Sequence, residues 1–248
     1  MKQAALLLTA AAFSFSGCAQ KPFYVQERRQ QSYPIDSTRQ VADSTVANFL
    51  KPYKAGVDTQ MKTIIGYTDI PLTKAQPESS LGNFMADAQL VAARKIDGKV
   101  AASILNYGGI RLNYVSPGNL TRGTMYELMP FDNMLSIVEI PGGVVQQFCD
   151  FMAVRKGWPV SGISYVIKDK KADSITINGQ PLNPHLIYKI ATNDYLARGG
   201  DNCDFLLPLR KRNTSVFLRD AMMDFVIERQ RNNQPLHPEI ENRVRYAE

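Results

Sequence analysis

The sequence predicts an α+β fold, in a single domain that runs from about residue 38 to the end of the chain. Strands and helices are mixed along the sequence, and two neighbouring strands read as a hairpin. The strands do not alternate regularly with helices, as they would in a purely βαβ protein. The chain has 248 residues, of which 44% are hydrophobic, so it can bury a sizeable core.

The first elements of the domain follow from caps and apolar spacing. Asp36 and Ser37 can cap a helix in which four apolar residues follow at helical spacing, namely Val41, Val46, Phe49 and Leu50. Residues 63–67 (TIIGY) predict a strand. Ser80 can cap a second helix, whose apolar stripe consists of Leu81, Phe84, Met85, Ala88 and Val91.

The middle of the chain continues with alternating short elements. Residues 101–105 are a short apolar run that predicts a buried strand, and residues 123–128 predict a short helix. Residues 135–140 predict another strand, followed by a helix at 144–152. These strands and helices are short enough to belong to one compact domain.

The last part of the chain contains the hairpin. Residues 163–167 and 174–177 predict its two strands, and a turn follows at 178–179, where Asn precedes Gly. Residues 188–192 predict a further strand, and residues 216–227 the last long helix.

The first 18 residues have the pattern of a signal peptide. Lys2 precedes a short apolar run at 4–15, and two small residues come directly before Cys18, which resembles a bacterial lipobox. We expect Cys18 to carry the lipid that anchors an exported protein at the cell envelope, on the periplasmic or outer-membrane face. Plain secretion with cleavage nearby is the alternative. Residues 19–37 are polar and are predicted to form a linker, with a loosely docked strand as the alternative.

The chain is basic, with a formal net charge of +6 and a pI of about 9.2. This charge is compatible with nucleic acid, anionic lipid or anionic small molecules. The basic residues at 210–212, Arg229 and Arg231 have no interleaved aromatic residues and match no nucleic-acid-binding motif, so we expect a solvated basic face and no nucleic-acid partner. No segment after the signal peptide approaches 18 consecutive apolar residues, so we expect a domain that is soluble apart from its anchor.

Four short stretches combine polar residues or glycines with the ends of predicted elements. They are residues 81–83 (LGN), 106–111 (NYGGIR), 130–133 (PFDN) and 193–201 (NDYLARGGD). Each stretch alone is typical of a turn or a cap. The double glycine can also let a ligand approach the backbone, with Asn106 and Arg111 on either side.

Together and in this order, the four stretches resemble the C-terminal domain of the 5′-nucleotidase family, which includes UDP-sugar hydrolases and cyclic-nucleotide phosphodiesterases. That domain carries an LGN helix start, an N-x-GGIR turn, a PF-x-N loop and an N-D/N-F-L-A-x-GGDG loop. The resemblance covers roughly residues 60–230. It implies the fold of that domain and a site that binds the base and ribose of a nucleoside or nucleotide.

The resemblance also implies a role for individual residues. Phe131 and Tyr195 match the two aromatic residues that stack on the base, although Tyr195 replaces the more usual phenylalanine. Asp201 matches the carboxylate that accepts hydrogen bonds from ribose hydroxyls. Asn106 and Arg111 match the groups that face the ribose and the phosphate, and a planar guanidinium suits an anionic ligand. The other residues of the implied site are Gly108, Gly109 and Asn133.

The sequence departs from the family pattern at one charged position. Family members often carry an arginine just before the segment that aligns with residues 78–80. Here residues 74–77 read Lys-Ala-Gln-Pro, so we expect one cationic contact to be missing.

The chain also lacks the motifs of the family's catalytic domain. That metallophosphatase domain holds two metal ions with D-x-H, GNH-D/E and G-H-x-H type motifs, which need many histidine and aspartate ligands. This sequence has two histidines, His185 and His237, and neither lies in such a motif. A G-x-S-x-G motif is missing as well. We therefore expect no catalytic residue, no metal site and no cofactor in this chain.

Three functional hypotheses remain. The first is the nucleotide-binding domain of a split 5′-nucleotidase, which positions the base and ribose for a separate metallophosphatase chain that carries the divalent metals. The second is a lipoprotein that binds nucleosides without catalysis. The third is a family member whose site has decayed into a structural or interaction module. A neighbouring gene for a metallophosphatase without its own C-terminal domain would favour the first over the second, and a protein that binds no nucleoside would favour the third.

Overall fold

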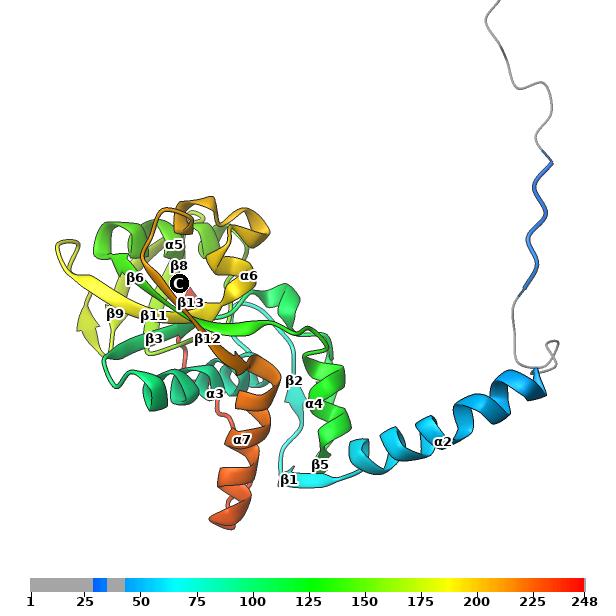
Figure 1. Ribbon diagram of the computed structural model, residues 1–248. Helices are drawn as coiled ribbons and strands as arrows, with labels where there is room; N and C mark the ends of the chain where they lie inside the picture. The colour runs from blue at the N-terminus through cyan, green and yellow to red at the C-terminus, as the bar shows by residue number, and fades with distance from the viewer. Residues whose placement is uncertain (1–28, 35–42, 248) are drawn as a thin grey trace, which may run out of the picture. The chain divides into compact units, whose positions relative to one another are not determined.

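The computed structural model describes residues 29–34 and 43–247 (Figure 1). Cys18 and the rest of the predicted signal peptide lie outside these described residues, as does most of the predicted linker. The chain divides into two units, residues 1–49 and 50–248, and the candidate site belongs to the second. Among the described residues, no helix combines the length and apolar character needed to cross a membrane.

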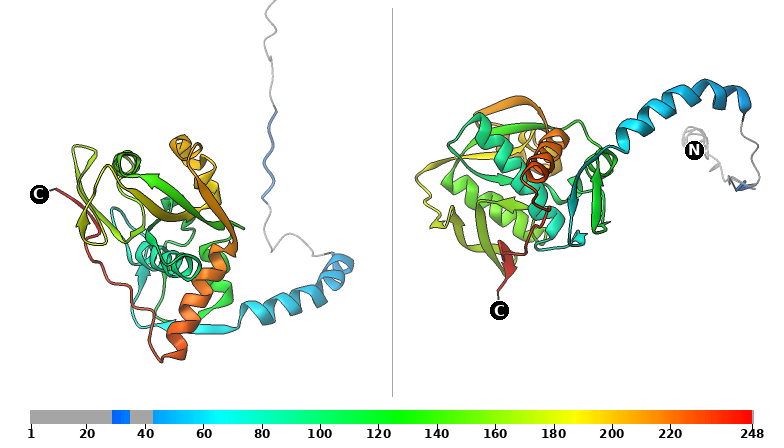
Figure 2. Two further views of the ribbon diagram at one scale, coloured as in Figure 1. Left: turned by 60° about the vertical axis from the view of Figure 1, so that its left-hand side comes forward. Right: turned by 90° about the horizontal axis from the view of Figure 1, so that it is seen from below.

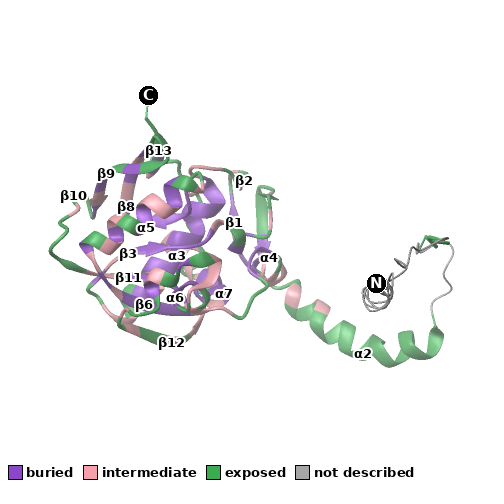
Figure 3. Cartoon of the chain, turned by 90° about the horizontal axis from the view of Figure 1, so that it is seen from above, coloured by how far each residue is buried: buried purple, intermediate pink, exposed green. Residues whose placement is uncertain are grey.

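Helix α2 (Ser44–Met61) is the first described helix. Its N-terminus is capped by the Asp43 carboxylate, which accepts hydrogen bonds from the backbone N–H of Thr45 (2.8 Å) and of Val46 (3.3 Å). The caps predicted at residues 36–37 lie outside the described residues. No residue of α2 is buried, in contrast to the central strands and to helix α3 (Figure 3).

A five-stranded sheet lies at the centre of the second unit, in the strand order β12-β6-β11-β3-β7 (Figure 1). Its strands are β3 (Val100–Ile104), β6 (Met134–Pro141), β7 (Val160–Ser161), β11 (Ile187–Asn193) and β12 (Lys211–Phe217). β3 and β11 are parallel, whereas β6 is antiparallel to β11, with Asn193 opposite Leu135. The C-terminal ends of β3 and β11 therefore meet the start of β6 at one end of the sheet.

The two faces of this sheet contribute to two hydrophobic cores, because successive side chains of a strand point to opposite faces. On β6, Leu135 and Ile137 belong to one core, and Val138 and Ile140 belong to the other.

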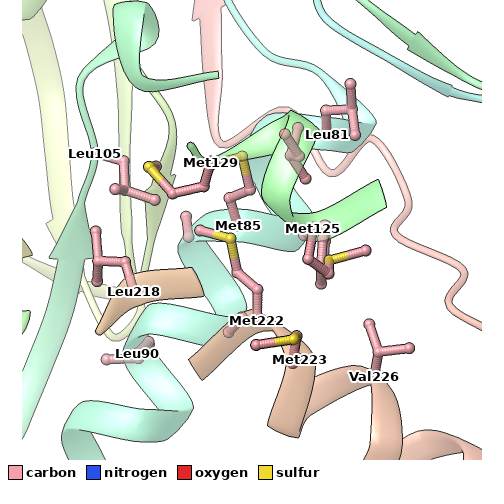
Figure 4. Packing of buried hydrophobic residues seen from close by; sticks show 14 of the residues in the cluster. Leu81, Met85, Leu90, Leu105, Met125, Met129, Leu218, Met222, Met223 and Val226 are labelled. Carbon is pink, nitrogen blue, oxygen red and sulfur yellow. The ribbon is translucent and has the colours of Figure 1, made fainter. Parts of the chain in front are cut away.

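Three helices pack into the first core, namely α3 (Ser80–Ile96), α4 (Arg122–Leu128) and α7 (Leu218–Arg231). Helices α3 and α7 lie side by side (Figures 1 and 2), and the rings of Phe84 and Phe225 meet between them at 6.0 Å. Figure 4 shows that methionines from all three helices interdigitate with leucines in this core. Flexible methionine side chains suit such irregular spaces.

The second core lies between the central sheet, helix α5 and a second sheet. Helix α5 is Gly142–Val154, and the second sheet has the order β10 (Gln180–Pro181), β9 (Lys171–Ile177), β8 (Ile163–Lys168) and β13 (Val244–Tyr246). Four aromatic residues pack edge to face here, namely Phe148, Phe151, Trp158 and Phe205.

The remaining strands form two short pairs. β1 (Ile64–Thr68) pairs with β5 (Gly118–Thr121), and β2 (Leu72–Thr73) pairs with β4 (Tyr114–Val115). Together these elements confirm the predicted α+β class.

Two helix starts were predicted wrongly, and strand β12 was not predicted. The last helix begins at Leu218, because Val216 and Phe217 end strand β12. The cap of α3 is Ser79, whose hydroxyl accepts a hydrogen bond from the N–H of Gly82 (3.1 Å). Ser80 instead accepts a hydrogen bond from the N–H of Thr73 (2.8 Å), and so ties α3 to β2.

Candidate functional site

One cleft of about 350 Å³ lies where β3, β6 and β11 meet at the end of the central sheet. All eight predicted site residues line it: Asn106, Gly108, Gly109, Arg111, Phe131, Asn133, Tyr195 and Asp201. They come from three segments, which follow β3, precede β6 and follow β11. The volume lies within the range of roughly 300–1,000 Å³ that is typical of small-molecule sites.

Asn106 connects the segment after β3 with the segment after β11. Its side-chain oxygen accepts a hydrogen bond from Nδ2 of Asn193 (3.0 Å), and its Nδ2 donates to Oδ2 of Asp201 (2.8 Å). Asn106 itself is 7% exposed. It is therefore a buried bridge that fixes one oxygen of the Asp201 carboxylate.

The two glycines after Asn106 serve different purposes. A Cβ on Gly109 would lie 3.1 Å from Oδ1 of Asn106, so this glycine leaves room for the asparagine side chain. A Cβ on Gly108 would meet nothing closer than 3.8 Å. Gly108 therefore has open space beside it, and the expectation that the glycine pair makes room for a ligand stays a prediction.

Phe131 and Tyr195 are large aromatic side chains that are exposed. They are 40% and 44% exposed, respectively, and both line the cleft. Tyr195 lies on helix α6 (Asp194–Ala197), which is capped by the Asn193 side chain. A Cβ on Gly200 would lie 2.6 Å from each of three ring atoms of Tyr195. The Gly200 backbone thus covers one face of the ring, and a ligand has access to the other.

The Asp201 carboxylate is held at both oxygens. Oδ2 accepts the bond from Asn106, and Oδ1 accepts a hydrogen bond from the Tyr195 hydroxyl (2.8 Å). The backbone N–H of Asp201 donates back to the same hydroxyl (3.1 Å). The hydrogen bond to Asp201 raises the pKa of Tyr195, since it stabilises the protonated phenol.

Arg111 is a cation that lines the cleft, and Lys74 is a second cation near Arg111 that does not line it. The guanidinium carbon of Arg111 is 5.5 Å from the ring centroid of Phe131. Nζ of Lys74 donates to the carbonyl of Ile110 (2.8 Å) and lies 4.3 Å from the ring centroid of Tyr107. Burial, and then the positive charge of Arg111, lower the pKa of Lys74.

Lys74 is a cation near Arg111 that does not line the cleft, so the expectation of a missing cationic contact stays a prediction. Within the described part of the chain, neither Lys74 nor Arg111 forms an ion pair with a carboxylate. Two neighbouring like charges repel each other, and a bound anion would relieve this repulsion. The sequence shows that residue 74 is a lysine. Its position near Arg111 depends on the pairing of β2 with β4, which the sequence does not show.

Arg219 is a further residue that the sequence did not reveal. Its guanidinium is buried under the loop that carries Phe131, where it donates to the carbonyls of Met129 and Phe131 (both 3.3 Å) and pairs with Asp132 (3.0 Å). It also stacks over the ring of Tyr126, 4.1 Å from its centroid. Arg219 thereby fixes the loop through these contacts. The sequence showed only a charged residue within the last predicted helix, which does not identify such a role.

The two histidines lie elsewhere. The backbone N–H of His185 donates to the Asn183 side chain in a turn, and Nδ1 of His237 is 2.7 Å from a carboxylate oxygen of Asp69. Over residues 29–34 and 43–247, no three His, Cys, Asp or Glu side chains are grouped so that they could hold a metal ion. The absence of a metal site from this protein stays a prediction.

Comparison with known proteins assigns the chain to a family. The sequence model of the 5′-nucleotidase C-terminal domain matches residues 59–207, more than half of the chain. The chain is 29% identical over 173 residues to the trifunctional nucleotide phosphoesterase YfkN of Bacillus subtilis, covering 61% of this chain and 12% of that protein. It is 26% identical over 172 residues to a 5′-nucleotidase of Vibrio cholerae, covering 64% of this chain and 30% of the relative.

A solved structure shares the fold. The 5′-nucleotidase precursor of Thermus thermophilus superimposes with a TM-score of 0.70 at 21% identity, over 82% of this chain and 43% of that one. The chain therefore spans less than half the length of each of these three proteins. Because the family model matches most of the folded unit, the chain belongs to the 5′-nucleotidase family, of which it carries the C-terminal domain.

Proposed function

We propose that this chain is the nucleotide-binding part of a split 5′-nucleotidase-type hydrolase, acting in nucleotide catabolism. In this proposal it positions the base and ribose of a nucleotide for a separate metallophosphatase chain. The observation that supports the proposal best is the cleft itself, in which two exposed aromatic rings, a fixed carboxylate and a guanidinium converge.

The base would bind between Phe131 and Tyr195. A purine or pyrimidine has two flat faces, and stacking on an aromatic side chain contributes on the order of 1–3 kcal/mol per contact. Because Gly200 covers one face of Tyr195, a base would stack on the opposite face. The ribose would then lie near Asp201, whose oxygens can each accept one further hydrogen bond.

The phosphate would lie toward Arg111 and Lys74. The guanidinium of Arg111 offers a planar set of donors for phosphate oxygens, and the ammonium of Lys74 adds a second charge. Since no carboxylate pairs with either cation among the described residues, both charges are available to an anion. This arrangement favours a nucleotide over an uncharged nucleoside.

Hydrolysis would take place on the partner. The sequence contains none of the family's metal-binding motifs, so the divalent metals would belong to the metallophosphatase chain. This chain would contribute orientation, which can supply a large part of a rate enhancement. A lipid on Cys18 would keep the protein at the cell envelope and raise its effective concentration near a partner on the same surface.

A mixing experiment tests the proposal. With Mn²⁺, Zn²⁺ or Mg²⁺, the purified protein alone should leave AMP intact. A metallophosphatase chain from the same organism that lacks this domain should hydrolyse AMP at least several-fold faster once the protein is added, because the substrate is then oriented. Phosphate release measures both rates.

Matched variants make this result specific. Tyr195→Ala should remove most of the gain, whereas Tyr114→Ala should not, because Tyr114 is also exposed (54%) but lies outside the cleft. Metal-dependent hydrolysis by this protein alone, lost on mutation of His185 or His237, would contradict the proposal. Nucleotide binding without any gain on mixing would instead favour a binding lipoprotein without catalytic partner.

A further inference from the structure

Tyr195 carries a hydroxyl that the more usual phenylalanine of this family position lacks. The hydroxyl is bonded twice to one residue, since it donates to Oδ1 of Asp201 (2.8 Å) and accepts from the N–H of Asp201 (3.1 Å). These two hydrogen bonds join the Tyr195 hydroxyl to both the carboxylate and the backbone N–H of Asp201. A phenylalanine could make neither of them.

Asp201 needs this support because of its backbone. Its φ is 54°, in the left-handed region, and it lies in a short turn after Gly199 and Gly200. Aspartate tolerates this conformation better than most residues, and its N–H donates to the Tyr195 hydroxyl. The Tyr195 hydroxyl satisfies that N–H, and the Gly200 backbone over the ring keeps the ring in place.

The hydrogen bonds also fix the orientation of the Asp201 carboxylate about its last side-chain bond. A carboxylate held at one oxygen only can rotate about its last side-chain bond, which has a broad torsional profile. Here Asn106 holds Oδ2 and Tyr195 holds Oδ1. Each oxygen has about two acceptor positions, so one remains on each. The carboxylate is thus preset to accept two hydrogen bonds from neighbouring hydroxyls of one ligand.

We propose that the Tyr195 hydroxyl is a positioning group that fixes Asp201 for a vicinal diol, and so makes the cleft selective for nucleosides with free 2′ and 3′ hydroxyls. The inference rests on the proposed function, which already places the ribose near Asp201, and deepens it by naming Tyr195 as the residue that positions this carboxylate. In this proposal Tyr195 has two roles. Its ring stacks on the base, and its hydroxyl orients the Asp201 carboxylate that accepts hydrogen bonds from the ribose.

The test is Tyr195→Phe, which keeps the ring and its contact with Gly200. Calorimetric titration with adenosine and with 2′,3′-dideoxyadenosine measures the preference for the diol. The wild-type protein should prefer adenosine by at least about tenfold. In Tyr195→Phe the affinity for adenosine should fall roughly fivefold, because the carboxylate is no longer preset, while the affinity for the dideoxy analogue should stay within about twofold.

Tyr114→Phe is the matched control and should change neither affinity, because Tyr114 lies outside the cleft. A thermal melt establishes that Tyr195→Phe is folded. Equal losses for both ligands would overturn the inference, since the hydroxyl would then support only the loop. Tighter adenosine binding would also overturn it, because the hydroxyl would then compete with the ribose. If the wild-type protein binds neither ligand, the proposed function fails together with the inference.

Discussion

Replacing Phe131 and Tyr195 together by alanine is expected to lower the affinity for AMP at least a hundredfold. Both rings line the cleft, and each would lose a stacking contact of on the order of 1–3 kcal/mol. Since about 1.4 kcal/mol corresponds to a factor of ten, each single variant should lose roughly tenfold. Isothermal titration calorimetry on the two single variants and the double variant measures the losses.

The loss should be confined to binding. Phe131 and Tyr195 are 40% and 44% exposed, so their removal leaves no cavity in either core. Tyr114→Ala, another exposed tyrosine, is the control for removing an aromatic ring from the surface. Dissociation constants that are unchanged in both single variants would show that no base binds between these rings.

Gly142→Ala should destabilise the protein by about 3 kcal/mol. Gly142 is the first residue of α5, where the chain leaves β6. A Cβ there would overlap the carbonyl oxygen of Asn183 and lie 2.8 Å from Cα of Pro184, so backbone would have to move. For a domain of this size the loss corresponds to a fall in Tm of about 6–12 °C, which differential scanning calorimetry measures.

The neighbouring glycine provides the control. A Cβ on Gly143 would meet no atom within 4 Å, and alanine favours a helix more than glycine does. Gly143→Ala should therefore leave Tm unchanged or raise it slightly. Equal Tm values for Gly142→Ala and the wild type would mean that the turn at residues 183–184 can move away at little cost.

The residues of the cleft could be predicted because each lies in a short contiguous motif. Asn106 and Arg111 belong to one such motif, and Tyr195 and Asp201 belong to another. The sequence did not reveal why these motifs meet. They meet because β3 and β11 are parallel neighbours, so the residues that follow both strands share one end of the sheet.

The supporting residues were harder to predict because their partners are distant in sequence. Arg219 contacts the carbonyls of Met129 and Phe131, and nothing near Arg219 in the sequence points to them. Lys74 could be identified as a cation, but not as a neighbour of Arg111. Residue spacing describes local structure, whereas these contacts depend on how α7 and β2 pack.

The errors in the fold have local causes. Strand β12 was missed because most of its residues are polar and only partly buried, so no apolar alternation marks it. Two adjacent serines, Ser79 and Ser80, made the start of α3 ambiguous by one residue. Such boundaries depend on which hydroxyl reaches the free N–H groups, which only the structure decides.

The most direct test of the central claim is calorimetric titration of the purified wild-type protein with AMP and with adenosine, in the absence of any other chain. We expect saturable binding of both at one site per protein, with AMP about tenfold tighter at low salt because Lys74 and Arg111 can pair with its phosphate. The advantage of AMP should shrink as salt is added, since these charges lie near solvent. Absence of saturable binding for both ligands would contradict the account.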